Sequence, residues 1–377
     1  MIGIIAEFNP LHNGHQRIID IAKTIDENLV IAMSGNITQR GNFASIDKHT
    51  RASMAIKSGA SIVVEIPPIF VASSAEYYAK GAVLTLQACG VEQIIFGSEI
   101  GDISQLENLY NLIQSKNVQN SIKQNIKLGN SYSASLLETF KNMGIAIDII
   151  TPNNILAIEY IKQCKKYGIK YQTIKRENNY NDSNINFFYP SATAIRELAQ
   201  VNNFEAIKNF VPEHALFPKE SFLTNNGLYT ILREKILNTG EILLHDIYDA
   251  TEGIENRIFN FAEKATSLEE LIDLTTTRRY TKQKIQRFLL HILLKITKDN
   301  AKYMLNNIDY YNVLAINKNC INLLSNDLLC TKYKDFIAKN LLNSNHFKLQ
   351  NSIDKLHSII NNKEFTFKNM VVVQTKN

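Results

Sequence analysis

Short apolar runs alternate with helical patterns along the first 200 residues, and this alternation restricts the fold more than any other feature of the chain. Four runs precede residue 100, and they are "IGIIAEF" (2–8), "LVIAMS" (29–34), "SIVVEI" (61–66) and "VEQIIFG" (91–97). Helical patterns lie between them, from Gly14 to about Ile25, from near Asp47, and from about Ser74 to Ala88. Short strands separated by helices predict an α/β fold with a parallel, doubly wound sheet.

The pattern changes after residue 100. Residues 104–142 predict a helical insert, and "AIDII" (146–150) predicts a strand. We then expect a helix over "PNNILAIEYIKQC" (152–164), a strand at "KYQTIK" (170–175) and a helix entered through Ser191. Beyond about Phe217 the strand signals fade, and patterns such as "QKIQRFLLHILLKI" are helical. The sequence therefore predicts two domains, residues 1–217 around the sheet and residues 218–377 mainly α-helical.

Composition sets wider limits on the function. The chain has 377 residues, 45% of them hydrophobic, which is enough for two domains with a sizeable core. No apolar run approaches the roughly 18 residues that cross a bilayer, and the start lacks a cleavable signal segment. We therefore expect a cytoplasmic protein without a membrane partner. The four cysteines show no zinc spacing and are expected to be reduced thiols in packed helices. The net charge of +5 is compatible with a polyanionic partner.

A polar loop, "EFNPLHNGHQRIID" (7–20), lies directly after the first predicted strand. Ligands of parallel α/β sheets bind at this end of a strand, where the next helix begins. Gly14 lets the backbone approach a ligand, and the first amides of the helix favour an anion such as phosphate. His12 and His15 add imidazole donors for charge on a transferring phosphoryl group. A lone histidine here would be an ordinary cap residue, but the H-x-G-H spacing favours a site. The absence of GxxxxGK(S/T) and GxGxxG argues against a P-loop ATPase and a dinucleotide-binding fold.

This loop resembles a known signature. "HNGH" (12–15) is similar to the HxGH motif of the HIGH nucleotidyltransferase superfamily, in which ATP lies over the loop and a nucleophile attacks its α-phosphate. Its members carry a second signature, ISSTxxR, late in a Rossmann-like domain. "PSATAIR" matches it with Ser191, Thr193 and Arg196 at a predicted helix start. Hydroxyls, amides and a guanidinium at such a place again suit phosphate, so the two motifs support each other.

Further segments narrow the resemblance to the bacterial tRNA(Met) cytidine acetate ligases. In the family's order they are "AEFNPLHNGH", "MSGNITQRGNFASIDKHTRASMA", "FGSEIGD", "PNNILAIEY", "IKR", "PSATAIRE" and "TTTRRYTKQKIQRFLLHILL". The resemblance covers residues 1 to about 295 and leaves the last 80 with little that matches. It implies that acetate is activated with ATP, with Mg²⁺ as the expected metal, to acetyl-adenylate. The acetyl group then passes to the exocyclic amine of the wobble cytidine of elongator tRNA(Met), which gives N4-acetylcytidine.

The resemblance also implies site residues. His12, His15 and Arg196 are expected to be catalytic, and no protein ligand for a metal is expected. The expected nucleotide contacts are the whole loop and five later positions: Glu7, Phe8, Asn9, Pro10, Leu11, His12, Asn13, Gly14, His15, Gln16, Arg17, Ile18, Ile19, Asp20, Gly101, Asn153, Arg176, Ser191 and Thr193. As single residues, Gly101, Asn153 and Arg176 would be a strand end, a helix cap and a surface cation.

The chain departs from the family pattern in two places, of which only the second limits this transfer. Phe8 and Leu11 stand where Tyr and Phe are more usual, which are conservative changes. Asn181 stands where many relatives have a histidine, so no role of that histidine is carried over.

The motifs do not fix the residues that hold acetate. Gln39 and Arg40 follow the second predicted strand, and Lys48 and Arg51 lie on the next helix, so all four are candidates. The alternative for each is a solvated side chain at the surface.

A basic stretch is the candidate RNA surface. Within ten residues without an acid it contains Arg278, Arg279, Lys282, Lys284 and Arg287. Tyr280 is interleaved and suited to stacking on a base. Such a run is usually a solvated helix face, but the resemblance favours RNA. Lys162, Lys165 and Lys166 on the "EYIKQCKK" helix are further candidates to extend this surface.

Other functions use the same loops. One is an adenylyltransferase that joins AMP to a small phosphorylated metabolite, and another is a non-catalytic RNA-binding protein. Transfer of an acyl-adenylate to a small amine, as in pantothenate synthetase, is a third. The oligomeric state is not determined by the sequence.

Overall fold

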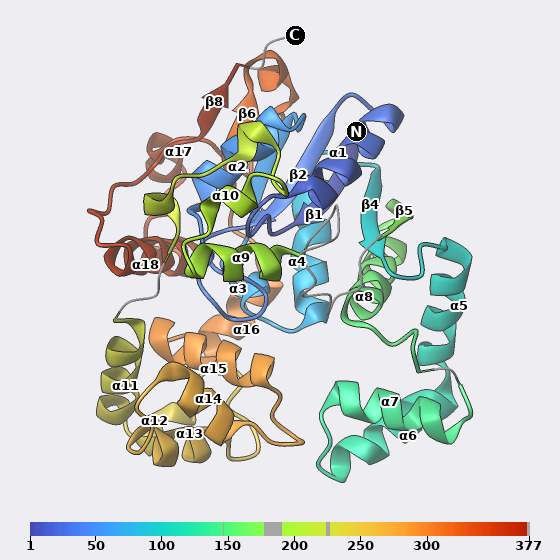
Figure 1. Ribbon diagram of the computed structural model, residues 1–377, viewed down its shortest axis with the longest axis vertical. Helices are drawn as coiled ribbons and strands as arrows, with labels where there is room; N and C mark the ends of the chain where they lie inside the picture. Colours follow the sequence, from blue (N-terminus) through green and yellow to red (C-terminus); the bar gives the residue numbers. More distant parts are fainter. Residues whose placement is uncertain (146, 177–190, 224–226, 375–377) are drawn as a thin grey trace.

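A mixed β-sheet forms the centre of the molecule (Figure 1). The computed structural model describes residues 1–145, 147–176, 191–223 and 227–374. Within these ranges the strand order is β5-β4-β1-β2-β3-β6-β7, with β8 beside β6. The strands are β1 (Ile2–Ala6), β2 (Leu29–Ser34), β3 (Ile62–Ile66), β4 (Gln93–Ser98), β5 (Lys170–Lys175), β6 (Tyr311–Asn317), β7 (Leu329–Cys330) and β8 (Val371–Val373).

The first five strands run parallel, as the alternation of apolar runs predicts. Every residue of β2 is buried. Val30 and Ala32 belong to the hydrophobic core on one face of the sheet, whereas Ile31 and Met33 belong to the core on the other. Burial on both faces explains why these strands appear in the sequence as continuous apolar runs.

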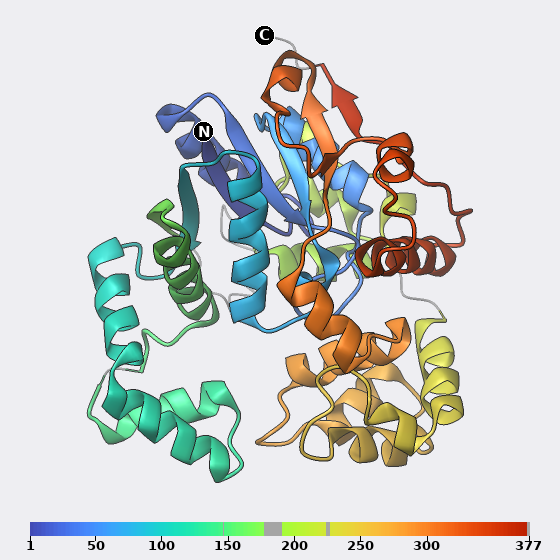
Figure 2. The same ribbon diagram turned by 180° about the vertical axis from the view of Figure 1, so that it is seen from behind.

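Helices cover both faces of the sheet (Figure 2). One face carries α1 (Asn13–Ile25), α2 (Lys48–Lys57), α9 (Ala192–Gln200) and α10 (Phe204–Ile207). The other carries α3 (Pro68–Val71), α4 (Ala75–Ala88) and α8 (Pro152–Tyr167). The predicted helix entries at Asp47 and Ser191 are confirmed, because each side chain caps its helix by accepting backbone N–H bonds.

Two helical lobes lie beyond the carboxyl ends of the parallel strands, toward which β4 points in Figure 1. The predicted insert is one lobe, with its own small core, and consists of α5 (Ile103–Gln114), α6 (Lys116–Lys127) and α7 (Tyr132–Asn142). The other consists of α11 (Leu228–Thr239), α12 (Glu241–Leu244), α13 (Ile254–Ala262), α14 (Leu268–Thr275) and α15 (Lys282–Leu294). In the part of the chain that the structure describes, no helix is long and apolar enough to cross a membrane.

One strand prediction is wrong, and strands that the sequence did not predict occur beyond Phe217. Residues 147–149 of "AIDII" form a bend and a turn, and residue 146 lies outside the described residues. Strands are also present beyond Phe217. Strand β6 pairs antiparallel with β3 and so brings the C-terminal part of the chain back to the sheet. That part also contains α16 (Lys298–Asn306), α17 (Tyr333–Ala338) and α18 (Asn345–Ile360). The domain division at residue 217 stays a prediction.

The four cysteines are unpaired, as expected. Cys330, however, lies in β7 and not in a helix. Asn181, the departure from the family pattern, falls outside the described residues.

Candidate active site

The polar loop leaves β1 at its carboxyl end, and His12 and His15 stack at the start of α1. Their ring centroids are 3.7 Å apart with an interplanar angle of 27°. Nδ1 of His12 accepts the N–H of Gly14 at 3.1 Å, and Nδ1 of His15 accepts the N–H of His12 at 3.3 Å. A backbone N–H can only donate, so both Nδ1 atoms are unprotonated. Each neutral ring therefore has its proton on Nε2 and presents a donor there.

Both histidines are neutral at physiological pH. Burial lowers the pKa of His12 to about 3, and the nearby charges of Arg176 and Arg196 act in the same direction. Burial, His12 and Arg176 also lower the pKa of His15 well below its ordinary value. The pair can therefore donate hydrogen bonds to a phosphate without itself being charged.

Gly14 leaves room for this arrangement. A Cβ at this position would lie 3.0 Å from Cε1 and 3.1 Å from Nδ1 of His12. A side chain would therefore crowd the imidazole that caps α1.

The two sequence motifs meet in space. Arg196 on α9 donates from Nη1 to the carbonyl oxygen of Asn9 at 2.8 Å and from Nη2 to Oγ1 of Thr193 at 3.0 Å. Ser191 caps α9 by accepting the N–H of Ala194 at 3.2 Å. The second motif thus lies directly against the first.

Arg176, just after β5, lies close to the two histidines, as Arg196 does to His12, since their charges affect the pKa values of these rings. Its backbone N–H donates to the carbonyl oxygen of Ser98 at 2.9 Å. Its Nε is shielded from solvent and has no hydrogen-bond partner among the described residues. Gly97 leaves room for it, since a Cβ there would lie 3.1 Å from Cγ of Arg176. Burial lowers the pKa of Arg176, and an unpaired buried guanidinium nitrogen suits an anionic ligand.

Gly101 and Asn153 lie near the ends of β4 and α8. Gly101 has φ +68°, and a Cβ there would lie 2.3 Å from Cβ of Lys175, so a glycine is required. Nδ2 of Asn153 donates to Oε1 of Glu99 at 2.6 Å. Thr151, not Asn153, caps α8.

Sequence reasoning missed Asn154, which is 1% exposed. Its Oδ1 accepts the N–H groups of Glu99 and Ile100 at 3.0 and 3.3 Å, and so it shapes the loop after β4. An asparagine beside Asn153 carries no sequence signal that separates this role from a surface position.

The predicted contacts in the loop differ in accessibility. The side chains of Phe8, Leu11 and Ile19 are at most 1% exposed and belong to the core below the loop. They position the loop, so a ligand would meet their backbone rather than their side chains. Gln16 donates to Asp20 at 2.8 Å and to the carbonyl oxygen of Ser58 at 2.9 Å.

Other polar residues of the loop hold neighbouring segments. Asn13 donates to the carbonyl oxygen of Asn209 at 3.2 Å, and Arg17 donates to that of Lys175 at 3.3 Å. Oε1 of Glu7 accepts the N–H of Gln39 at 2.7 Å.

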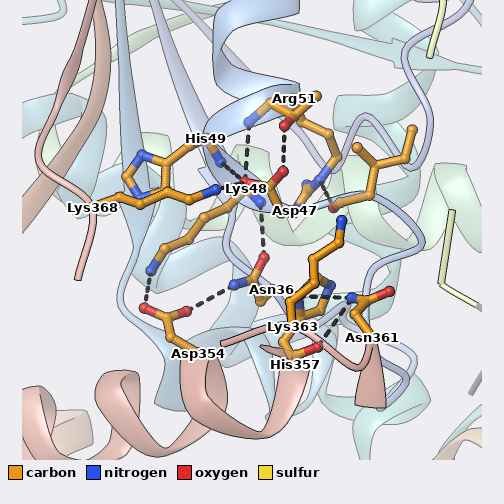
Figure 3. A network of polar contacts seen from close by, with 12 residues as sticks. Asn36, Asp47, Lys48, His49, Arg51, Asp354, His357, Asn361, Lys363 and Lys368 are labelled. Atoms are coloured by element: carbon orange, nitrogen blue, oxygen red, sulfur yellow. Dashed lines mark hydrogen bonds and ion pairs between the residues drawn. The ribbon is translucent and has the colours of Figure 1, made fainter. Parts of the chain in front are cut away.

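Lys48 and Arg51 are buried side chains with protein partners and not solvated charges (Figure 3). Arg51 is 0% exposed and donates to the carbonyl oxygens of four residues at the ends of β1 and β2 and before α2, namely Glu7, Ser34, Gly35 and Ile46. Nζ of Lys48 binds Glu65 at 2.9 Å and Asp354 at 2.7 Å. Both side chains are occupied by structural contacts, so of the four candidates only Gln39 and Arg40 are left for acetate.

The basic stretch before and within α15 is partly paired. Arg278 binds Glu138 of the insert at 3.1 Å, Arg279 binds Glu252 at 3.5 Å, and Lys282 binds Asp273. These pairs are exposed and therefore weak.

Tyr280 is 6% exposed, and its hydroxyl donates to the carbonyl oxygen of Glu252, so the prediction that it stacks on a base is wrong. On α8, Lys162 binds Glu76 at 2.6 Å and Lys165 binds Glu107 at 3.3 Å. Lys166 lies over the ring of Tyr167.

Comparison with known proteins agrees with this geometry. Residues 1–370 match the family model described as HIGH Nucleotidyl Transferase. The tRNA(Met) cytidine acetate ligase of Caldanaerobacter subterraneus subsp. tengcongensis is 36% identical over 315 residues, which are 79% of this chain and 78% of the relative. That of Clostridium perfringens is 34% identical over 337 residues, 84% of each chain. The crystal structure of Thermotoga maritima TmcAL bound with alpha-thio ATP is similar with a TM-score of 0.84 at 25% identity, over 95% of this chain and 94% of that one.

Proposed function

The chain belongs to the tRNA(Met) cytidine acetate ligase family of the HIGH nucleotidyl transferases, and on that basis we propose that it is an ATP-dependent acetate ligase. It forms acetyl-adenylate and passes the acetyl group to the exocyclic amine of the wobble cytidine of elongator tRNA(Met). The observation that carries this proposal is the contact between the two motifs, in which Arg196 binds the carbonyl oxygen of Asn9 beside the stacked histidines. Cytoplasmic tRNA is the partner, so we place the protein in the cytoplasm.

The first step needs charge stabilisation more than acid–base chemistry. Acetate is already an anion at pH 7 and attacks the α-phosphate with its own oxygen, while pyrophosphate leaves. Nε2 of His12 and of His15 supply neutral donors, and Arg176 and Arg196 supply fixed positive charge for the phosphates.

A magnesium ion would be carried by the nucleotide. Among the described residues no group of three or more His, Cys, Asp and Glu side chains could hold a metal ion. The phosphates of ATP would therefore supply most of its ligands, as is usual for Mg²⁺.

Acetate and RNA approach from the side of the helical lobes. Gln39 is fixed beside Glu7, and Arg40 follows it, so these two residues are our candidates for the acetate carboxylate. Five cations before and within α15 are our candidates for RNA phosphates, and they are Arg278, Arg279, Lys282, Lys284 and Arg287. In the second step the amine attacks the acyl carbon, the bond from that carbon to the phosphate oxygen breaks, and AMP leaves.

The test is pyrophosphate exchange into ATP, measured with and without acetate on the wild type and on His15→Ala. We expect acetate-dependent exchange in the wild type and its loss in the variant. Exchange that ignores acetate, or transfer of AMP onto a phosphorylated metabolite instead, would overturn the ligase assignment.

A further inference from the structure

A hairpin after β2 is fastened to the nucleotide loop. Residues 37–43, which we call the β2 hairpin, are closed by a bridge between Ile37 and Phe43. Within the hairpin, the N–H of Gln39 donates to Oε1 of Glu7 at 2.7 Å. Any displacement of the hairpin is therefore transmitted directly to the residue at the start of the ATP loop.

The tip of the β2 hairpin rests on the backbone of α15. Gly41 has φ +86°, and a Cβ at this position would lie 2.5 Å from the nitrogen of Arg287 and 2.7 Å from the carbonyl carbon of Gln286. Backbone atoms cannot give way as the end of a flexible side chain can. The contact therefore requires glycine on the hairpin, and it joins the helix that carries the basic stretch to the loop that carries the candidate acetate ligands.

Arg287 lies on α15 at this contact, and its side chain contains a donor without a partner among the described residues. Its Nε is buried and has no hydrogen-bond partner within the described ranges. Burial lowers the pKa of Arg287, and the carboxylate of Asp249 opposes that effect. Lys284, almost one turn earlier, donates to Oγ1 of Thr251 at 2.9 Å. The cations of α15 thus extend from the exposed Lys282 at its start to the partly buried Arg287 beside the hairpin.

The loop opposite Arg287 is strained. Asp249 and Glu252 have φ +69° and +59°, in the left-handed region that non-glycine residues rarely adopt. Such strain is retained mainly where a fixed backbone shape is needed, as at binding sites.

We propose that the β2 hairpin and α15 together bind the acceptor nucleotide, with the guanidinium of Arg287 donating to an adjacent phosphate of a single-stranded RNA loop. This inference rests on the proposed function, because the acceptor is the RNA of that reaction. An enzyme that modifies a base needs the base outside the stack, and an unpaired loop supplies it at little cost. Gly41 acts as a positioning residue, since it sets the distance between the RNA side and the ATP side of the site.

The experiment compares two activities in each variant. Acetate-dependent pyrophosphate exchange without RNA reports the first step, and acetyl transfer to a tRNA(Met) transcript reports both. We expect Arg287→Gln to lower the ratio of transfer to exchange at least tenfold. Lys295→Gln removes the same charge at the far end of α15, where the residue is exposed, and should leave the ratio unchanged. Gly41→Ala should lower transfer and exchange together, because it displaces the hairpin that also carries Gln39 and Arg40.

Each other result overturns the inference. An equal loss of transfer and exchange in Arg287→Gln, together with a lower melting temperature, would make Arg287 a structural residue. Full transfer by Arg287→Lys, which keeps the positive charge without the guanidinium, would remove the role of the guanidinium. Failure of the wild type to exchange pyrophosphate with acetate would instead refute the proposed function, so the two failures are distinguishable.

Discussion

Replacing Lys48 with methionine removes the cation that two buried carboxylates share. Nζ lies 2.9 Å from Oε2 of Glu65 and 2.7 Å from Oδ2 of Asp354. Lys48 and Glu65 are each 2% exposed, and Asp354 is 14% exposed. Methionine has a similar length without the charge, so the variant leaves two like charges facing each other away from solvent.

The expected loss is large. Removing one partner of a buried ion pair costs about 3–5 kcal/mol. Glu65 keeps a hydrogen bond from Nδ2 of Asn312 at 2.7 Å, and Asp354 keeps one from Nδ2 of Asn36 at 2.9 Å. We therefore expect the lower end, about 3 kcal/mol at pH 7, which is a substantial part of the 5–15 kcal/mol typical of a folded domain.

The loss should depend on pH. Burial opposes the charge of Lys48, but Asp354 and Glu65 outweigh this effect and raise the pKa of Lys48. In the wild type the contribution of Lys48 to the free energy of unfolding is therefore complete below the ordinary lysine pKa of about 10.4. In the variant an unpaired carboxylate must take up a proton on folding, so its folded pKa is raised and its penalty grows with pH. The wild type should thus be flat between pH 6 and 8, whereas the variant should lose up to about 1.4 kcal/mol per pH unit.

Urea unfolding followed by far-UV circular dichroism measures this effect, since the chain has no tryptophan. Lys282→Met, which breaks an exposed pair, is the matched control and should unfold close to the wild type. Adding Asp354→Asn to Lys48→Met should restore stability at pH 8, because one of the opposed charges is gone. A Lys48→Met variant as stable as the control, or equally unstable at pH 6 and 8, would refute the reasoning.

Three further outcomes are expected. Burial lowers the pKa of His12 to about 3, so its ring stays neutral at higher pH. The rate of acetate-dependent exchange should therefore show no change between pH 5 and 8 that is caused by a titrating histidine. A change in rate centred near pH 6.5 would contradict this expectation. Gly101→Ala should lower the free energy of unfolding by about 1–3 kcal/mol in urea titrations, since its left-handed backbone lies against Lys175. Arg196→Lys should reduce kcat/KM for exchange about 100-fold, because lysine lacks the planar fork that reaches Asn9, and an unchanged value would remove Arg196 from the site.

The motifs were predictable because their geometry is local. His12, Gly14 and His15 lie within one helix start, so their mutual contacts follow from their spacing. Ser191 and Arg196 likewise belong to one helix start. Their meeting depends on the fold, because the contact between Arg196 and Asn9 joins residues 187 positions apart.

Charged residues outside the motifs could not be placed in the same way. Lys48 follows a helix cap in the sequence as a surface lysine would, and its partner Asp354 lies on α18, in the segment with little family signal. Arg51 binds backbone carbonyls, which leave no trace in the sequence. Strand β6 was missed because helices precede and follow it, so that its apolar run resembled a helix core.

The same reasoning separates the two halves of the reaction. Within each motif of the ATP side the contacts are short-range, so the sequence spacing predicts them. The RNA side depends on how a helix face meets other elements, and Tyr280 shows the consequence, because a residue placed for stacking is instead bound to the backbone of Glu252. Gly41 shows the converse, since nothing in its sequence neighbourhood reveals that it touches α15. At this contact we expect Arg287→Gln, and not Gly41→Ala, to separate acceptor binding from acetate activation, because the hairpin of Gly41 is also bound to Glu7.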